Sequence, residues 1–250
     1  MSLARFSLLA LGSLAVALAA GCGGNRDPIA SGASRLDAAT ATTAAVNSET
    51  NVNLIAHATV PEVAVFATPG AGERPVHLLG NPTANGGPLV FLVERTAGEW
   101  VLVNLPVRPN GSTGWVRSSD VTLTQHDYSI VVELAAHRIT VRRGREVILA
   151  EPVAVGTRDT PTPGGRFYIT ELLMAPDPNT VYGPYAYGLS GFSNALSSFA
   201  GGEAIIGIHG NNDEASLGSD VSAGCIRMSN AGIRKLARTL PLGTPVHIEP

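Results

Sequence analysis

Glycine and proline interrupt this sequence so often that little of it could form a helix. The chain has 28 glycines and 17 prolines among 250 residues, and aromatic residues make up only 5% of it. Both residues break regular elements, so the segments between them suit short strands joined by turns. We therefore expect a mostly β protein rather than a helical bundle. The length suffices for two small folded domains or one large domain.

The first folded unit is expected over residues 59–125. Short apolar runs separated by Pro, Gly and Asn clusters predict strands at residues 63–66, 89–93, 100–103 and 114–116. An Asn110-Gly111 pair precedes the last run and is typical of a hairpin turn, because both residues tolerate a positive φ. No helical period occurs in this span, so we predict a small barrel of about five strands.

The second folded unit is expected over residues 126–250. Apolar runs predict strands at residues 129–133, 137–141, 147–155, 167–170 and 204–208. One late helix is predicted by apolar residues at i, i+3, i+4 and i+7 from Ile233. Ser229 or Asn230 can cap its start, and Pro241 would end it. The fold class is therefore mostly β with a late α-helix.

The N-terminus predicts export. Residues 7–20 form an apolar run behind Arg5. A permanent membrane span needs about 20 apolar residues, so this shorter run suits the core of a signal peptide. Residues 22–58 are rich in Ala, Thr, Ser, Gly and Asn, and they show no durable apolar period. We expect them to be a flexible tether, because they cannot bury enough surface to offset their ordering entropy.

Charge and cysteine content exclude several functions. The net charge of −3 and the pI near 6.1 give no basic footprint, so we expect no nucleic-acid partner. Two cysteines, Cys22 and Cys225, are too few for a disulfide framework or a Cys-rich zinc site. The histidines other than His209 lack metal-ligand spacing, and we therefore expect no metal and no other cofactor.

A histidine and a cysteine near the end of the chain are candidates for nucleophilic catalysis. His209 follows the predicted strand at residues 204–208, and Cys225 comes sixteen residues later. The polar loop at residues 211–221 is short enough to bring the chain back beside the strand. A thiol needs a neighbouring base, because its free pKa is about 8.5 and the thiolate is the nucleophile. On these two residues alone, a structural histidine and an inert buried cysteine remain open alternatives.

Glycines beside the two residues fit the same chemistry. The carbonyl of Gly210 could hold the tautomer of the imidazole, so that no carboxylate is needed. Gly224 removes a side chain directly before Cys225 and lets a substrate approach. The backbone N–H groups of Gly224 and Cys225 are candidate oxyanion donors.

The second unit resembles the YkuD-type L,D-transpeptidases, which are cysteine enzymes of bacterial cell walls. The resemblance spans residues 127–249 and is carried by Ile208-His209-Gly210 and Ser222-Ala223-Gly224-Cys225-Ile226-Arg227-Met228, with support from residues 160–167 and 182–187. It implies that Cys225 is the nucleophile, that His209 is the base, and that the Gly210 carbonyl orients this base. It also implies that Arg227 lies beside the catalytic pocket, although a structural salt bridge is an open alternative.

One position departs from the family pattern. Many members have a histidine two residues before the nucleophile, and this chain has Ala223 there. The family pattern gives the role of base to the histidine of the His-Gly pair, here His209. We therefore expect activity, while acceptor handling and rate stay open.

The resemblance implies a two-step acyl transfer on peptidoglycan stem peptides, which serve as donor and acceptor. The thiolate attacks the third residue of a tetrapeptide, releases D-Ala and leaves a thioester. The side-chain amine of a second stem then attacks the thioester and forms a 3-3 cross-link. We interpret residues 174–202 as a long loop that covers the stems. The expected substrate-binding and oxyanion residues are Ser222, Gly224, Arg227, Tyr182 and Tyr187.

Two further resemblances concern the rest of the chain. Residues 18–22, Leu-Ala-Ala-Gly-Cys, resemble the lipobox of bacterial lipoproteins, with Ala19 where a leucine is usual. This implies a signal peptide at residues 1–21, lipidation of Cys22 and a membrane anchor in the cell envelope; an ordinary secretory peptide cleaved near Ala20 is the alternative. The first unit resembles a bacterial SH3-like domain through Glu99-Trp100-Val101 and Gly114-Trp115-Val116. That unit is either a ligand-binding module or a spacer that packs on the second unit.

Other functions remain open from the sequence. With water as acceptor, the same site is a carboxypeptidase; with a protein as acceptor, it attaches wall peptides to that protein. A non-catalytic wall-binding lipoprotein is a further alternative. An NlpC-type endopeptidase is disfavoured, because in those enzymes the cysteine precedes the histidine.

Overall fold

The computed structural model describes residues 52–70, 72, 74–199 and 201–250. The predicted signal peptide, Cys22 and residues 22–51 of the predicted tether lie outside these ranges. The described chain is mostly β, as predicted, with one α-helix. Within the same ranges, no helix combines the length and the apolar character that a membrane crossing requires.

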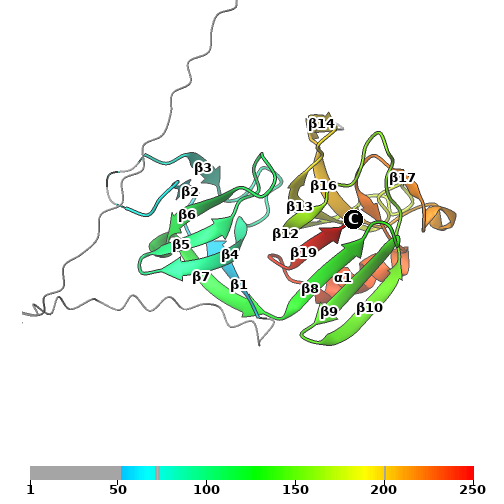
Figure 1. Ribbon diagram of the computed structural model, residues 1–250, viewed down its shortest axis with the longest axis horizontal. Helices are drawn as coiled ribbons and strands as arrows, with labels where there is room; N and C mark the ends of the chain where they lie inside the picture. Colours follow the sequence, from blue (N-terminus) through cyan, green and yellow to red (C-terminus); the bar gives the residue numbers. More distant parts are fainter. Residues whose placement is uncertain (1–51, 71, 73, 200) are drawn as a thin grey trace, which may run out of the picture. The chain divides into compact units, whose positions relative to one another are not determined.

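The N-terminal unit, residues 53–126, is built on a five-stranded sheet in the order β6-β5-β4-β1-β7 (Figure 1). All its strand pairs are antiparallel. The strands are β1 (Asn53–Ala58), β4 (Val90–Ala97), β5 (Trp100–Asn104), β6 (Thr113–Arg117) and β7 (Val121–His126). A hairpin of β2 (Glu62–Val65) and β3 (His77–Gly80) adjoins it through a bridge between Phe66 and Trp115. A 3-10 turn, η1 (Ser118–Asp120), precedes β7. The hairpin predicted at Asn110-Gly111 is confirmed, because this pair lies between the paired strands β5 and β6 and Gly111 has φ +82°.

Strand β1 corrects the predicted boundary of the tether. Residues 53–58 were assigned to the tether, but they pair with both β4 and β7. Ile55 and Ala56 are fully buried there. The six residues lack an alternating pattern of their own. Strands β4 and β7 supply their pairing partners, and apolar residues distant in the chain, among them Tyr168, cover Ile55. The SH3-like identity of this unit stays a prediction.

The C-terminal unit, residues 127–250, contains an eight-stranded sheet in the order β10-β9-β8-β19-β12-β13-β16-β18. Its strands are β8 (Tyr128–Glu133), β9 (Arg138–Arg143), β10 (Glu146–Pro152), β12 (Gly165–Met174), β13 (Tyr185–Phe192), β16 (Ile205–His209), β18 (Ile226–Arg227) and β19 (Pro245–Glu249). Neighbours are antiparallel except for β8 with β19 and β16 with β18. The smaller elements are β11 (Val155–Gly156), β14 (Ser198–Phe199), β15 (Gly202–Glu203), β17 (Asp220–Ser222) and the 3-10 turn η2 (Glu214–Ser216).

Strand β13 lies inside the segment that we predicted to be a loop, so that prediction was wrong for residues 185–192. The strand is central, because β12 and β16 pair with its two edges. Its glycines hide it from sequence analysis, yet close packing requires them. A Cβ atom on Gly188 would lie 2.7 Å from Cγ of Glu171, and one on Gly191 would lie 2.5 Å from the Phe167 ring.

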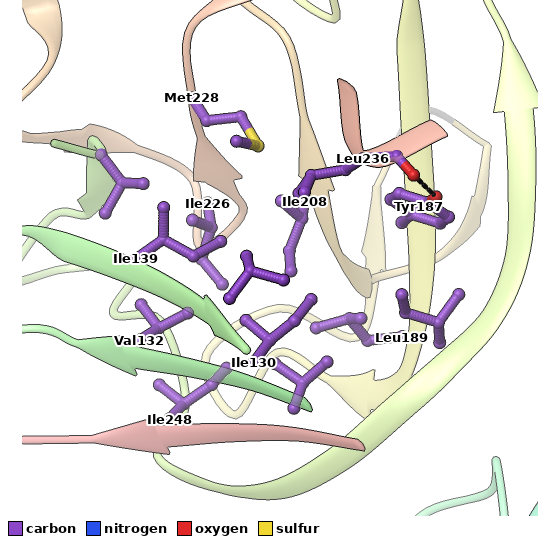
Figure 2. Packing of buried hydrophobic residues seen from close by; sticks show 14 of the residues in the cluster. Ile130, Val132, Ile139, Tyr187, Leu189, Ile208, Ile226, Met228, Leu236 and Ile248 are labelled. Carbon is purple, nitrogen blue, oxygen red and sulfur yellow. Dashed lines mark hydrogen bonds between the residues drawn. The ribbon is translucent and has the colours of Figure 1, made fainter. Parts of the chain in front are cut away.

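The late helix is confirmed as α1 (Asn230–Thr239). Ser229 caps its start by accepting a hydrogen bond from the N–H of Gly232 at 2.9 Å. Ile233 and Leu236 turn into the core of the C-terminal unit and are fully buried. Figure 2 shows this core, where side chains from β8, β9, β13, β16, β18 and β19 meet Leu236 of the helix. The core fixes β16 and β18, whose ends carry the candidate site.

Candidate active site

His209 is the last residue of β16, and its side chain is only 3% exposed. Its Nδ1 lies 2.7 Å from the carbonyl oxygen of Gly210. A carbonyl oxygen can only accept, so Nδ1 carries the proton and Nε2 keeps the free lone pair of a base. The predicted role of Gly210 in holding the imidazole therefore has a matching contact. The ring of Tyr182 lies beside the imidazole, with 5.0 Å between the two ring centroids.

Cys225 lies directly before β18 and is a free, partly buried cysteine. Parallel pairing of β16 with β18 places His209 opposite Arg227, two residues beyond the cysteine. Cys225, His209 and Arg227 all line one pocket, together with Tyr182 and Ser222. Ala223, at the departure from the family pattern, also lines this pocket. The topology thus brings together the thiol and imidazole that the sequence paired.

Burial controls the protonation of both groups. It raises the pKa of the Cys225 thiol above its ordinary value, while a hydrogen bond from the backbone of Gly207 and the charge of Arg227 partly oppose this rise. Burial lowers the pKa of His209 to about 4. The hydrogen bond to the Gly210 carbonyl raises this pKa, and the charge of Arg227 lowers it further. At neutral pH the site therefore rests as a neutral thiol and a neutral imidazole. The imidazole is free to accept a proton when the thiol attacks.

The turn before Cys225 is held by two hydroxyl groups. The Ser222 hydroxyl accepts a hydrogen bond from the N–H of Gly224 at 3.1 Å and donates one to the carbonyl of Cys225. The Thr162 hydroxyl donates to the carbonyl of Gly224 at 2.9 Å. Of the two expected oxyanion donors, the N–H of Gly224 thus already has an acceptor. The N–H of Cys225 has none among the described residues.

Arg227 forms no salt bridge with any described residue. Its Nε is buried and has no hydrogen-bond partner within that part of the chain. Among the described residues that line the pocket, Arg227 is the only one with a permanent charge. A buried, unpaired guanidinium N–H is costly, so the position favours an anionic group of a bound ligand. The structure thus does not support the alternative of a structural salt bridge.

The two expected tyrosines lie in different environments. Tyr182 lines the pocket and is 38% exposed. Tyr187, in contrast, is fully buried on β13 and does not line the pocket. Its hydroxyl donates to the carbonyl of Leu236 at 2.8 Å (Figure 2). The carbonyl of Leu240, at 3.3 Å, shares the same proton. This corrects the expected contact of Tyr187 with substrate, because its one polar group is already committed to the end of α1.

The segment that follows β13 lies within residues 174–202, which the sequence predicted to cover the stems, but sequence analysis missed the two side chains that hold it. Ser193 and Leu196 line the pocket from this segment. Arg108, between β5 and β6, donates to the carbonyls of Ser193 at 3.0 Å and Leu196 at 3.1 Å. Asn110 donates to the carbonyl of Phe192 and accepts from its N–H, both at 2.8 Å. No local pattern signals these contacts, because they join residues more than 80 positions apart in the chain.

No cluster of three or more His, Cys, Asp or Glu side chains in the described ranges could hold a metal ion.

Comparison with known proteins identifies the family. The family model of the L,D-transpeptidase catalytic domain, YkuD, matches residues 127–248. The chain is 31% identical to YkuD of Bacillus licheniformis over 177 residues, which cover 71% of this chain and 87% of that protein. It is 37% identical to YkuD of Bacillus subtilis over 121 residues, which cover 48% of this chain and 65% of that protein.

Solved structures of L,D-transpeptidases are similar at lower identity. The Enterococcus faecium enzyme is 22% identical, with a TM-score of 0.39 over 48% of this chain and 49% of that chain. The Mycobacterium smegmatis enzyme is 16% identical, with a TM-score of 0.41 over 63% of this chain and 80% of that chain. On the family match and the B. licheniformis relative, the chain belongs to the YkuD family of L,D-transpeptidases.

Proposed function

We propose that this protein is a peptidoglycan L,D-transpeptidase that forms 3-3 cross-links through a thioester on Cys225. The observation that carries the proposal is that Cys225 and His209 line one pocket and that the Gly210 carbonyl leaves Nε2 of His209 as the free base. Membership of the YkuD family supports the same reaction.

The first step is acylation by the donor stem. The Cys225 thiol transfers its proton to Nε2 of His209, and the sulfur attacks the carbonyl carbon of the third residue of a tetrapeptide. The carbonyl electrons move to oxygen, and the N–H of Cys225 is the available hydrogen-bond donor for that oxyanion. When the oxyanion collapses, the C–N bond to D-Ala breaks and the leaving amine takes the proton from the imidazolium. A thioester and free D-Ala result.

The second step transfers the acyl group to an acceptor. The side-chain amine of another stem attacks the thioester carbon and gives a proton to His209. The C–S bond then breaks, an amide forms, and the thiol recovers its proton. With water in place of the amine, the same step is a hydrolysis and the enzyme acts as a carboxypeptidase.

Arg227 is proposed to bind a carboxylate of the donor stem. Its buried Nε lacks a partner among the described residues, and a carboxylate accepts two hydrogen bonds from a guanidinium. Arg227 is two residues from Cys225, so the bound carboxylate would fix the donor close to the thiol. Tyr182, beside the His209 ring, is the proposed wall of the same subsite.

The remaining proposals concern location. We place the protein in the cell envelope, outside the cytoplasm, because its proposed substrate is cell-wall peptidoglycan. Lipidation of Cys22 would anchor it to a membrane. The SH3-like assignment of the N-terminal unit belongs with these proposals.

The test is intact-protein mass spectrometry with a disaccharide tetrapeptide donor. We expect an adduct on the wild-type chain, equal in mass to the donor less D-Ala, and none on Cys225→Ala. Cys22→Ala is the matched control, because it removes the other cysteine and should keep the adduct. An adduct that persists on Cys225→Ala, or a wild-type chain that never forms one, refutes the assignment and favours a non-catalytic wall-binding protein.

The same experiment identifies the acceptor. Added stem peptide should convert the adduct into a cross-linked product faster than water converts it into free tripeptide. A tripeptide product alone would favour the carboxypeptidase. Membership of the YkuD family excludes the alternative that this protein is an NlpC-type endopeptidase.

A further inference from the structure

In the peptide bond between Gly224 and Cys225, the carbonyl has a hydrogen-bond partner among the described residues and the N–H has none. Three polar groups around it have partners: the N–H of Gly224, the carbonyl of Gly224 and the carbonyl of Cys225. The carbonyl of Gly224 is held by a residue from another part of the chain, Thr162. The N–H of Cys225 is the one group left for a ligand among the described residues.

Thr162 is itself firmly fixed. It is 5% exposed and lies between Pro161 and Pro163, which restrict the backbone on both sides. Its hydroxyl accepts a hydrogen bond from the N–H of Gly156 at 2.8 Å. The one hydroxyl proton therefore goes to the carbonyl of Gly224, at 2.9 Å.

Peptide geometry links this contact to the catalytic step. In a planar trans peptide the C=O and the N–H point in opposite directions. Fixing the carbonyl of Gly224 toward Thr162 therefore fixes the N–H of Cys225 away from Thr162. Gly224 permits the arrangement, because its φ of +117° is strained for residues that have a Cβ. Among the described residues, no hydrogen bond other than the one from Thr162 holds this peptide plane itself.

We propose that Thr162 is a positioning residue whose hydroxyl orients the N–H of Cys225 toward the oxyanion of the acylation step. The proposal rests on the proposed function, since the oxyanion forms only when Cys225 attacks a carbonyl. Thr162 does not line the pocket that contains Cys225 and His209. It acts through the backbone between Gly224 and Cys225.

The decisive variant is Thr162→Val, which keeps the shape of the side chain and removes the hydroxyl. Thr162→Ala is measured alongside it, so the result does not depend on how valine packs. Thr162→Ser restores the hydroxyl. Thr160→Val is the matched control, because it removes a nearby hydroxyl that donates to the carbonyl of Ser222 at 3.2 Å. That carbonyl keeps the N–H of Thr157 as a donor at 3.0 Å, so it is not left without a partner.

We expect Thr162→Val and Thr162→Ala to slow acylation by the tetrapeptide about 10- to 100-fold, with KM within about twofold of wild type. Deleting an oxyanion donor outright costs about 100- to 1,000-fold, and here the donor remains but is misoriented. Alkylation of Cys225 by iodoacetamide should keep its wild-type rate, because displacement at a saturated carbon forms no oxyanion. Thr162→Ser and Thr160→Val should acylate within about threefold of wild type.

Two results would overturn the proposal. One is wild-type acylation by both Thr162→Val and Thr162→Ala. The other is an equal loss of acylation and alkylation, which would mean that Thr162 only places the sulfur. If the wild-type chain does not react with the tetrapeptide, the proposed function fails, and p-nitrophenyl acetate still tests the inference because its acyl transfer passes through an oxyanion. Thr162→Val should then react more slowly than wild type with that ester, and equal rates would refute the orienting role.

Discussion

Removing the hydroxyl of Tyr187 should destabilise the C-terminal unit without weakening donor binding. Tyr187→Phe keeps the ring, which packs in the fully buried core, and deletes only the oxygen. That oxygen donates to two carbonyls at the end of α1, those of Leu236 and Leu240. The variant therefore tests whether Tyr187 is a core residue, as its position indicates, or a substrate contact.

The expected magnitude follows from what each carbonyl loses. The carbonyl of Leu236 keeps a hydrogen bond from the N–H of Leu240 at 2.8 Å, so its loss is small. The carbonyl of Leu240 belongs to the last turn, where intrahelical donors are missing, and this residue is only 6% exposed. A buried acceptor left without a partner costs about 1–3 kcal/mol. We therefore expect the free energy of unfolding to fall by about 1–3 kcal/mol.

The assay is urea unfolding followed by far-ultraviolet circular dichroism. Both tryptophans, Trp100 and Trp115, lie in the N-terminal unit, so their fluorescence in the same titration serves as an internal reference. Tyr182→Phe is the matched control, because this tyrosine is 38% exposed and should change the free energy of unfolding by less than about 0.5 kcal/mol. A Tyr187→Phe chain of unchanged stability with a raised donor KM would refute the reasoning and restore Tyr187 as a substrate contact.

Four further predictions concern the pocket and its wall. Because the pKa of His209 falls from 6.5 to about 4 on folding, the unfolded state binds more protons between these values, and the free energy of unfolding should drop by about 3 kcal/mol as pH falls from 6.5 to 4. Urea titrations against pH would show this drop as the difference between wild type and His209→Gln, because burial also lowers the pKa of His57 and His126 and both variants share that contribution. Iodoacetamide should alkylate Cys225 with a rate that keeps rising above the pH range of an ordinary thiol, because burial raises its pKa, whereas a plateau near neutral pH would contradict the neutral resting state. Arg227→Gln should raise the donor KM about 10- to 100-fold, since a hydrogen bond to a charged group contributes about 1.5–3 kcal/mol, and an unchanged KM would remove Arg227 from the subsite. Arg108→Ala should raise the donor KM several-fold by releasing the carbonyls of Ser193 and Leu196. Arg108 also stacks on the Phe192 ring at 4.8 Å, so the control is Arg95→Ala, which loses a stacking contact of the same length on Trp115 and should leave KM unchanged.

Sequence and structure contribute differently to the secondary structure. The cap at Ser229, the stop at Pro241 and the turn at Asn110-Gly111 are local, because each depends on residues within a few positions of one another, and all three could be predicted. Strands β1 and β13 could not be predicted in the same way. Strand β1 is short and has no alternating pattern, and strand β13 is interrupted by two glycines. Pairing partners far along the chain determine that both segments are strands.

The residues of the candidate site also fall into those that the sequence predicts and those whose roles depend on tertiary contacts. Sequence by itself paired His209 with Cys225 and named Gly210, because a short motif and its spacing carry that information. Only the tertiary structure decided that Tyr187 belongs to the core, that Nε of Arg227 is left without a partner among the described residues, and that Thr162 holds the peptide before Cys225. The physical reason is that burial and hydrogen-bond partners arise from residues distant in sequence. The two cysteines are too few for a disulfide framework, but their number alone could not establish that the Cys225 thiol rests protonated beside a neutral imidazole.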